Sequence, residues 1–190
     1  AGPALHVVGL VFRPDQVTNL AGNTAFKAKQ AELSAALDAH MLRVNDNGFI
    51  PEGASVLGYI NSRRAGAYPL RQVMALANLA ARRDPANLQR FVAELDNENE
   101  VLRYWGAQGL LMLGEAAQSA VPAMKSALDA EQSPHVRVSL CESLVKLTND
   151  RRALRLLGQM LDIEDDGPLR LQAINALAFL GERAKPVLPA

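Results

Sequence analysis

Three histidines and one cysteine are the side chains of this 190-residue chain best suited to metal binding or nucleophilic catalysis. His6, His40 and His135 are far apart in the sequence, without the spacing that metal ligands usually show. Cys141 falls within an apolar helical stretch at a position where two related segments have small or apolar residues. A reactive thiolate needs a nearby base and a lowered pKa. We therefore expect Cys141 to be a packing residue.

The densest acidic run extends from Asp162 to Gly167 and suggests calcium at first sight. It lacks the ligand spacing and the final glutamate of an EF-hand loop, so we expect an acidic turn instead. The chain has no glycine-rich dinucleotide or phosphate-binding pattern. We therefore expect no catalytic residue, no cofactor and no metal, which means that this chain is not itself an enzyme.

Aspartates and arginines recur with a regular period of 33 or 34 residues. They form a ladder of Asp96, Arg103, Asp129, Arg137, Asp162 and Arg170. One interpretation is structural: each aspartate caps a turn and meets an arginine between stacked repeats. The other is functional: the arginines form a stripe that holds an anionic partner. The structural interpretation is favoured because the neighbouring acids would neutralise such a stripe, although exposed pairs contribute only about 0–1 kcal/mol each.

The repeats contain one aromatic pair, Tyr104 and Trp105. Trp105 either packs within or between repeats, which we favour, or is an exposed anchor for a partner, since tryptophan is enriched at binding hot spots. Together with Gln108 and Glu142, these two aromatic residues are the candidate interaction surface.

An internal repeat determines the elements that position these residues. Each unit is expected to be a shorter helix ending in Leu-Asp, a tight turn, and a longer helix that starts just before the arginine. Leucines recur in register along the longer helices, at Leu110, Leu144 and Leu177. In the first copy Leu102, Gly106, Leu110 and Leu113 form one apolar stripe at helical period. The small residue in this stripe allows a neighbouring helix to approach closely.

A single helical pair cannot cover its own apolar face, but stacked pairs form one continuous core. The spacing therefore predicts an α-solenoid. It includes a helix over Leu70–Ala81 and, after a turn at Asp84-Pro85, a short helix around Leu88–Leu95. Pro189-Ala190 aligns with Pro122-Ala123 inside a further short helix. We expect from this that the chain is a piece of a longer protein.

Composition narrows the class of function. Hydrophobic residues make up 49% and charged residues 21% of the chain, which is typical of a globular protein and excludes general disorder. The 20 basic and 20 acidic residues give a net charge of zero, which argues against nucleic acid as a partner. Apolar stretches are far shorter than the roughly 18 residues of a membrane span, so we expect no membrane insertion.

The first 66 residues do not repeat. Residues 5–12 are apolar and β-branched and predict a strand, and Thr24–Val44 predicts a helix with Asn23 or Thr24 as its N-cap. A turn at Asp46-Asn47-Gly48 and an extended piece over Phe49–Glu52 follow. A lone strand leaves its backbone groups unpaired, so segment 5–12 pairs with something that this chain does not encode, pairs with a second copy, or is not a strand.

The segment Val7–Ala21 resembles the sulfatase C-terminal signature, L-Y-D-L-x-x-D-P-x-E-x-x-N-L-A. The later stretch Asp46-Asn47-Gly48-Phe49-Ile50-Pro51-Glu52 is similar to the D-x-G-F-I-P-E tail of that family. Arg103–Gly114 is similar to the HEAT-like repeats that follow the catalytic domain in a subset of bacterial sulfatases. The resemblance covers nearly the whole chain. It implies a periplasmic or secreted parent, a location that the chain itself does not reveal.

The predicted fold is therefore mostly all-α. A strand-plus-helix appendage over residues 1–66 precedes a HEAT-like α-solenoid of about three to four helical pairs over residues 67–190. Sulfatases make their formylglycine within C-x-P-x-R or S-x-P-x-R, and this chain has neither motif. The catalytic domain would have to lie elsewhere in a longer parent.

Three functions follow from these observations. The first is a non-catalytic region of a sulfatase-like hydrolase that serves as a docking or oligomerisation surface. The second is a free-standing HEAT-repeat module that binds a protein partner through the face formed by the longer helices. The third is an enzyme on a HEAT scaffold, such as a phycobilin lyase or an alkylated-base DNA glycosylase, and rests on fold analogy alone.

Overall fold

The computed structural model describes residues 19–188 as two compact units that divide between Asp46 and Asn47. Residues 47–66, which the sequence analysis grouped with the appendage, belong to the second unit. Every regular element between residues 19 and 188 is helical, and this part of the chain has no strand. The strand predicted over residues 5–12, and the pairing proposed for it, lie outside the described residues.

The first unit contains the helix predicted from its apolar spacing. A 3₁₀ turn at Thr24–Phe26 leads into α1, Lys27–Val44. The side chain of Asn23 accepts a hydrogen bond from the backbone of Ala25 at 3.0 Å, so the predicted N-cap is confirmed. The helix ends at Asn45 in the left-handed conformation, with φ 51°. No residue of α1 is buried.

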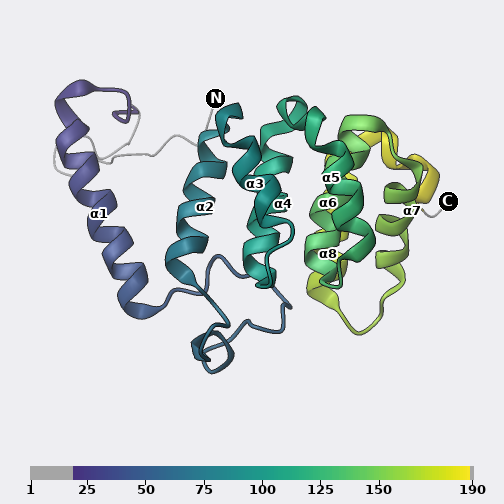
Figure 1. The fold of residues 1–190 in the computed structure, drawn as a ribbon, viewed down its shortest axis with the longest axis horizontal. Helices are drawn as coiled ribbons and strands as arrows, with labels where there is room; N and C mark the ends of the chain where they lie inside the picture. The colour runs from purple at the N-terminus through teal and green to yellow at the C-terminus, as the bar shows by residue number, and fades with distance from the viewer. Residues whose placement is uncertain (1–18, 189–190) are drawn as a thin grey trace. The chain divides into compact units, whose positions relative to one another are not determined.

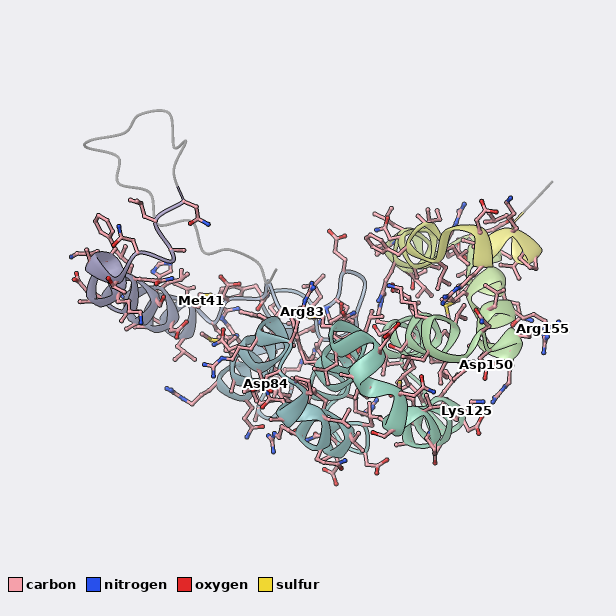
Figure 2. All side chains as sticks on the ribbon, turned by 90° about the horizontal axis from the view of Figure 1, so that it is seen from above. Met41, Arg83, Asp84, Lys125, Asp150 and Arg155 are labelled. Carbon is pink, nitrogen blue, oxygen red and sulfur yellow. The ribbon has the colours of Figure 1, made fainter. Side chains whose placement is uncertain are left out.

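The second unit is a two-layer array of seven α-helices (Figure 1). They are α2 Leu70–Arg82, α3 Leu88–Glu94, α4 Glu100–Leu113, α5 Val121–Ala130, α6 Pro134–Thr148, α7 Arg151–Gln159 and α8 Gly167–Leu180. The longer helices α2, α4, α6 and α8 pack side by side in one row, which we call the inner row. The shorter helices α3, α5 and α7 form the second layer, along which Lys125, Asp150 and Arg155 lie (Figure 2). The predicted solenoid architecture is confirmed.

The core lies along the predicted leucine stripe. Leu110, Leu144 and Leu177 occupy equivalent positions on α4, α6 and α8 and are 0, 1 and 3% exposed. Burying a leucine side chain stabilises a fold by about 1.5–3 kcal/mol. The same position in each repeat therefore contributes to one continuous core.

Two glycines of α4 let α3 pack closely against it, as the sequence predicted for Gly106. A Cβ added at Gly106 would lie 2.9 Å from Cβ of Glu94 and 3.0 Å from the backbone oxygen of Phe91. A Cβ added at Gly109 would lie 2.3 Å from the ring of Phe91, which is fully buried. The ring of Phe91 thus occupies the space that any side chain at residue 109 would need.

The inner helices end in the left-handed region. Gly114 and Gly181 follow α4 and α8 with φ of 58° and 57°. In the middle copy the residue equivalent to Gly114 is Thr148, which still belongs to α6. α6 is longer by one residue, and Asn149 takes the left-handed conformation with φ 53°. Asparagine tolerates this conformation, whereas a β-branched threonine does not.

Residues 49–67, which we call the strap, are a series of turns that crosses the N-terminal ends of the inner helices. Asn99, the N-cap of α4, donates to the backbone oxygens of Gly66 and Ala67 at 3.1 and 2.9 Å. A Cβ added at Gly53 would lie 3.4 Å from His135 on α6 and 3.1 Å from Pro168 on α8. The extended piece predicted over residues 49–52 is instead part of these turns.

Candidate protein-interaction groove

A groove of about 500 Å³ runs across α4, α6 and α8 and reaches the end of α2 at Arg83. Two sets of equivalent residues line the groove, and each set contains one residue from each of α4, α6 and α8. The upper set is Gln108, Glu142 and Asn175, and the lower set, one helical turn further on, is Met112, Lys146 and Phe179. The groove is therefore a direct product of the repeat, since each inner helix places the next residue of both sets.

An ion pair and an exposed aromatic ring form the lower part of the groove. Glu142 on α6 is 7% exposed and pairs with Lys146 one turn later. The ammonium group of Lys146 also lies 5.5 Å from the ring centre of Phe179 on α8, within reach of a cation–π interaction. Phe179 is 75% exposed. This corner presents an apolar ring beside a positive charge.

Hydrogen bonds made by glutamine side chains link the three helices that form the groove. Gln108 Nε2 of α4 donates to Ser139 Oγ of α6 at 2.9 Å. Gln172 Nε2 of α8 donates to the backbone oxygen of His135 at 3.2 Å, and its Oε1 lies 2.9 Å from Nδ1 of that histidine. Since Oε1 is an acceptor, Nδ1 of His135 is the donor of this second bond. These bonds fix the spacing of the inner helices.

Burial and two neighbouring side chains shift the pKa of Tyr104 on α4. Burial raises the pKa of the Tyr104 hydroxyl, and the carboxylate of Glu142 raises it further, while a hydrogen bond with Gln108 acts in the opposite direction. The phenol therefore stays neutral at physiological pH and contributes to the groove as a hydrogen-bonding group.

Residues 88–178, which run from α3 into α8, match the family model of HEAT repeats. This part of the chain is HEAT-like. Neither the curated proteins nor the solved structures gave a match to the chain. The HEAT-like half of the resemblance drawn from the sequence is thereby confirmed, and the sulfatase half stays a prediction.

Three of the four predicted interaction residues line the groove between these HEAT-like repeats, namely Tyr104, Gln108 and Glu142. Trp105 is outside the groove, because it packs against the strap. Its Nε1 donates to the backbone oxygen of Phe49 at 2.8 Å, and the two rings meet edge to face with their centres 5.9 Å apart. Trp105 is therefore a packing residue and not an exposed anchor for a partner, as the sequence favoured. Sequence reasoning missed Lys146 and Phe179, although the repeat aligns them with Met112.

The predicted Asp–Arg ladder does not form as direct pairs. Among the described residues, no ion pair joins Asp96 to Arg103, Asp129 to Arg137, or Asp162 to Arg170. Asp96, Asp129 and Asp162 lie at the ends of the short helices, and their side chains are exposed. These short side chains do not reach forward to the arginine that follows each of them. Asp129 pairs instead with Arg152 of the next repeat.

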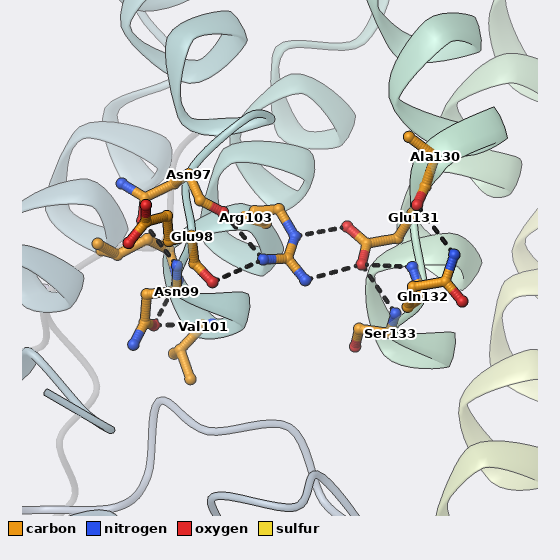
Figure 3. Close-up of polar contacts among 10 residues, drawn as sticks. Asn97, Glu98, Asn99, Val101, Arg103, Ala130, Glu131, Gln132 and Ser133 are labelled. Atoms are coloured by element: carbon orange, nitrogen blue, oxygen red, sulfur yellow. Dashed lines mark hydrogen bonds and ion pairs between the residues drawn. The ribbon is translucent and has the colours of Figure 1, made fainter.

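Arg103 bridges two HEAT-like repeats through a different acid, Glu131 (Figure 3). Its Nη1 also donates to the backbone oxygens of Asn97 and Glu98, at 2.9 and 3.0 Å. The hydrogen bonds with Glu131 raise the pKa of the Arg103 guanidinium, and burial only partly opposes them. Arg103 is therefore committed to the repeat interface rather than to an anionic partner.

The structure also places the other residues that were considered for chemistry. Cys141 is fully buried, and burial raises the pKa of its thiol to about 12, although the nearby Arg137 acts to lower it. Between residues 19 and 188, no group of three or more His, Cys, Asp or Glu side chains could hold a metal ion. His6 lies outside this range. No helix in the same range is long and apolar enough to span a membrane.

Proposed function

We propose that this chain is a non-catalytic protein-interaction module that binds a segment of another protein along the groove. The observation that carries the proposal is the repetition of groove positions on α4, α6 and α8, which ends in the exposed ring of Phe179. A HEAT-like repeat that covers residues 88–178 supports the same class of function.

The chemistry of the groove favours a segment that carries both an apolar and an acidic side chain. Phe179 and Met112 offer apolar surface, and Lys146 and Arg83 offer positive charge. Glu142 is the one acid among the lining residues and is already paired with Lys146. A partner carboxylate would therefore meet a groove with a net excess of one positive charge.

The spacing of the helices also suits an extended segment. Packed helices lie about 8–10 Å apart, and an extended chain advances about 3.3 Å per residue. Every third residue of a bound segment would then meet the next inner helix. Asn175 carries an exposed amide at one such step, which can donate to and accept from a backbone.

Selection from a peptide phage library against the whole chain tests this proposal. Selected peptides should share apolar and acidic residues, and we expect Phe179→Ala and Lys146→Glu each to weaken binding of a synthetic selected peptide about tenfold or more. The matched control is Tyr59→Ala, because Tyr59 is an equally exposed aromatic residue on the strap, at 74%. Unchanged affinity in both groove variants, measured by calorimetry, would contradict the proposal.

We further propose that the module is the C-terminal region of a sulfatase-like hydrolase, with the groove serving as its docking or oligomerisation surface. The order of the two motif segments and the repeats supports this. The second motif, Asp46–Glu52, lies within the described residues, whereas most of the first does not.

Mass spectrometry of the native polypeptide distinguishes this parent from a free-standing module. Peptides from the same polypeptide that contain C-x-P-x-R or S-x-P-x-R upstream of residue 1 would support the sulfatase parent. A native mass equal to that of the 190 residues would rule it out and leave the free-standing interaction module.

A further inference from the structure

A chain of hydrogen bonds runs along the groove from α4 to α8. Gln108 Nε2 donates to Ser139 Oγ at 2.9 Å, and Ser139 Oγ donates in turn to the backbone oxygen of His135 at 3.2 Å. The same backbone oxygen accepts from Gln172 Nε2 of α8. These bonds occupy many of the polar groups of the groove, and they determine which groups remain available to a partner.

Two hydrogen-bonding groups remain, one at each side of the groove. The hydrogen bond with Gln108 lowers the pKa of the Tyr104 hydroxyl, so the amide donates to the phenol oxygen and the O–H stays available as a donor. Asn175 on α8 is exposed, and its side-chain amide forms no hydrogen bond with another residue between 19 and 188. The groove thus offers a donor from α4 and a second donor from α8.

The spacing of the inner helices decides which conformation of a partner segment fits this groove. Packed helices lie about 8–10 Å apart, so equivalent groove residues recur at that distance. Three residues of a β-strand advance about 10 Å, but residues i and i+3 then face opposite sides. A polyproline II segment has three residues per turn and a rise of 3.1 Å, so residues i and i+3 face the same side after about 9.3 Å. Only this conformation repeats in step with the helices.

We propose that the groove recognises a proline-rich segment of a partner protein in the polyproline II conformation. This inference rests on the proposed function, because it names the conformation and the composition of the segment that the groove binds. The carbonyl groups of a polyproline II segment form no internal hydrogen bonds. They can therefore accept from Tyr104 and Asn175, which need no N–H group of the partner.

The apolar and charged residues of the groove fit the same segment. The rings of Tyr104 on α4 and Phe179 on α8 lie on helices that are two steps apart, about 16–20 Å, which is about two turns of polyproline II. Grooves lined by aromatic rings bind this conformation because the segment loses little entropy on binding. Lys146 lies 5.5 Å from the ring centre of Phe179. An acidic residue of the partner would therefore follow the proline that packs on this ring.

The sequences and the proline tolerance of library-selected peptides test the inference. We expect prolines at intervals of three in the selected peptides, with an acidic residue at one end. Replacing one of these prolines by glycine should raise the Kd of the synthetic peptide about threefold or more, because the free peptide then has more conformations to lose. A new proline at a residue that faces solvent should change the Kd less than about threefold. Loss of binding with a new proline at every interior residue would overturn the inference, since a bound helix or strand needs its N–H groups.

Substitutions in the chain test the two donors. Tyr104→Phe and Asn175→Ala should each raise the Kd of the same peptide about three- to tenfold while the circular dichroism spectrum stays unchanged. The matched control is Tyr59→Phe, because this hydroxyl lies on the strap and should not affect binding. Unchanged affinity in both Tyr104→Phe and Asn175→Ala would overturn the inference.

The dependence on Phe179 separates this inference from the proposed function. If a peptide needs Phe179 but contains no proline and tolerates none, the groove binds protein segments and the polyproline II conformation is wrong. If no selected peptide depends on Phe179 or Lys146, both the proposed function and this inference fail.

Discussion

Arg103 and Glu131, 28 residues apart, form a fork of two parallel hydrogen bonds, 2.8 Å from Nε and 2.9 Å from Nη2. The side chain of Glu131 is 2% exposed, and its carboxylate also accepts from the backbone of Gln132 and Ser133 at 2.9 and 2.8 Å. The pair joins the first turn of α4 to the turn before α6 (Figure 3). It therefore fixes how one repeat is placed on the next.

Loss of either partner should destabilise the array, because it leaves the other charge without its counterpart. We expect Glu131→Ala and Arg103→Ala each to lower the free energy of unfolding by about 3 kcal/mol. Arg103→Lys should recover only part of this loss, since an ammonium group cannot form the fork. Urea unfolding of both single variants and of the double variant measures the pair. Additive losses in the double variant would show that the two side chains are not coupled.

The repeat pattern predicts the helices and the buried stripe but not the partners of long side chains. The leucine spacing identifies α4, α6 and α8 because one face of each helix must be apolar. It does not tell in which direction an arginine at a helix start reaches. Arg103 extends forward to Glu131 rather than back to Asp96. Trp105 likewise finds Phe49, 56 residues earlier, on a strap whose course no periodicity records.

The groove was predictable only in part for the same reason. Tyr104, Gln108 and Glu142 stand out by residue type, and the repeat places them on one side of the inner row. The sequence of the last repeat does not mark Phe179 as a groove residue, since an aromatic residue in a helix usually belongs to the core. Its exposure depends on the packing of α8 against α6, which only the three-dimensional arrangement shows.

Gly109→Ala should be strongly destabilising, because the new methyl group would overlap the ring of Phe91. Overpacking of this kind lowers the free energy of unfolding by about 1–3 kcal/mol. The matched control is Gly167→Ala in the first turn of α8, where no atom lies within 4 Å of the added Cβ. We expect this control to be neutral or slightly stabilising. Thermal unfolding of the two variants side by side measures the difference, and equal Tm values would contradict the close packing of α3 on α4.

Leu144→Asp should unfold the array, since it places a charge at a position that is 1% exposed in the middle repeat. The expected result is loss of the cooperative melting transition followed by circular dichroism. Lys146→Ala is the control two residues away, because Lys146 lies at the surface and its ion pair with Glu142 is local to one helix. A Leu144→Asp variant that melts like the wild type would show that the register of the repeat is wrong.

Cys141 should not react in the folded chain. Burial holds its pKa at about 12, so the thiolate that reacts with alkylating agents is hardly populated at neutral pH. We expect iodoacetamide to label Cys141 only after denaturation, at a rate that follows unfolding. Labelling of the native chain as fast as that of a free thiol, detected by intact mass, would show that α6 opens locally or that its core face is accessible.

Asp150 should make the stability of α7 depend on pH in a defined direction. As the N-cap of α7, its carboxylate accepts from the backbone of Arg152 and Ala153 at 3.0 Å each and pairs with Lys125 of α5 at 3.0 Å. Burial acts to raise the pKa of this carboxyl, but the hydrogen bonds with Ala153 and Lys125 outweigh it and lower the pKa.

A carboxyl with a lowered pKa stabilises the fold above the pKa of the unfolded chain, about 3.9, and loses this contribution as the pH falls through the folded value. Asp150→Asn keeps the capping oxygen but removes the charge, so we expect a loss of about 0.5–1 kcal/mol at neutral pH. Asp150→Ala removes the cap as well and should lose about 1–2 kcal/mol. Melting curves should show the gap between wild type and Asp150→Asn closing below about pH 4. A gap that is constant down to pH values well below that would mean that the charge of Asp150 does not stabilise α7.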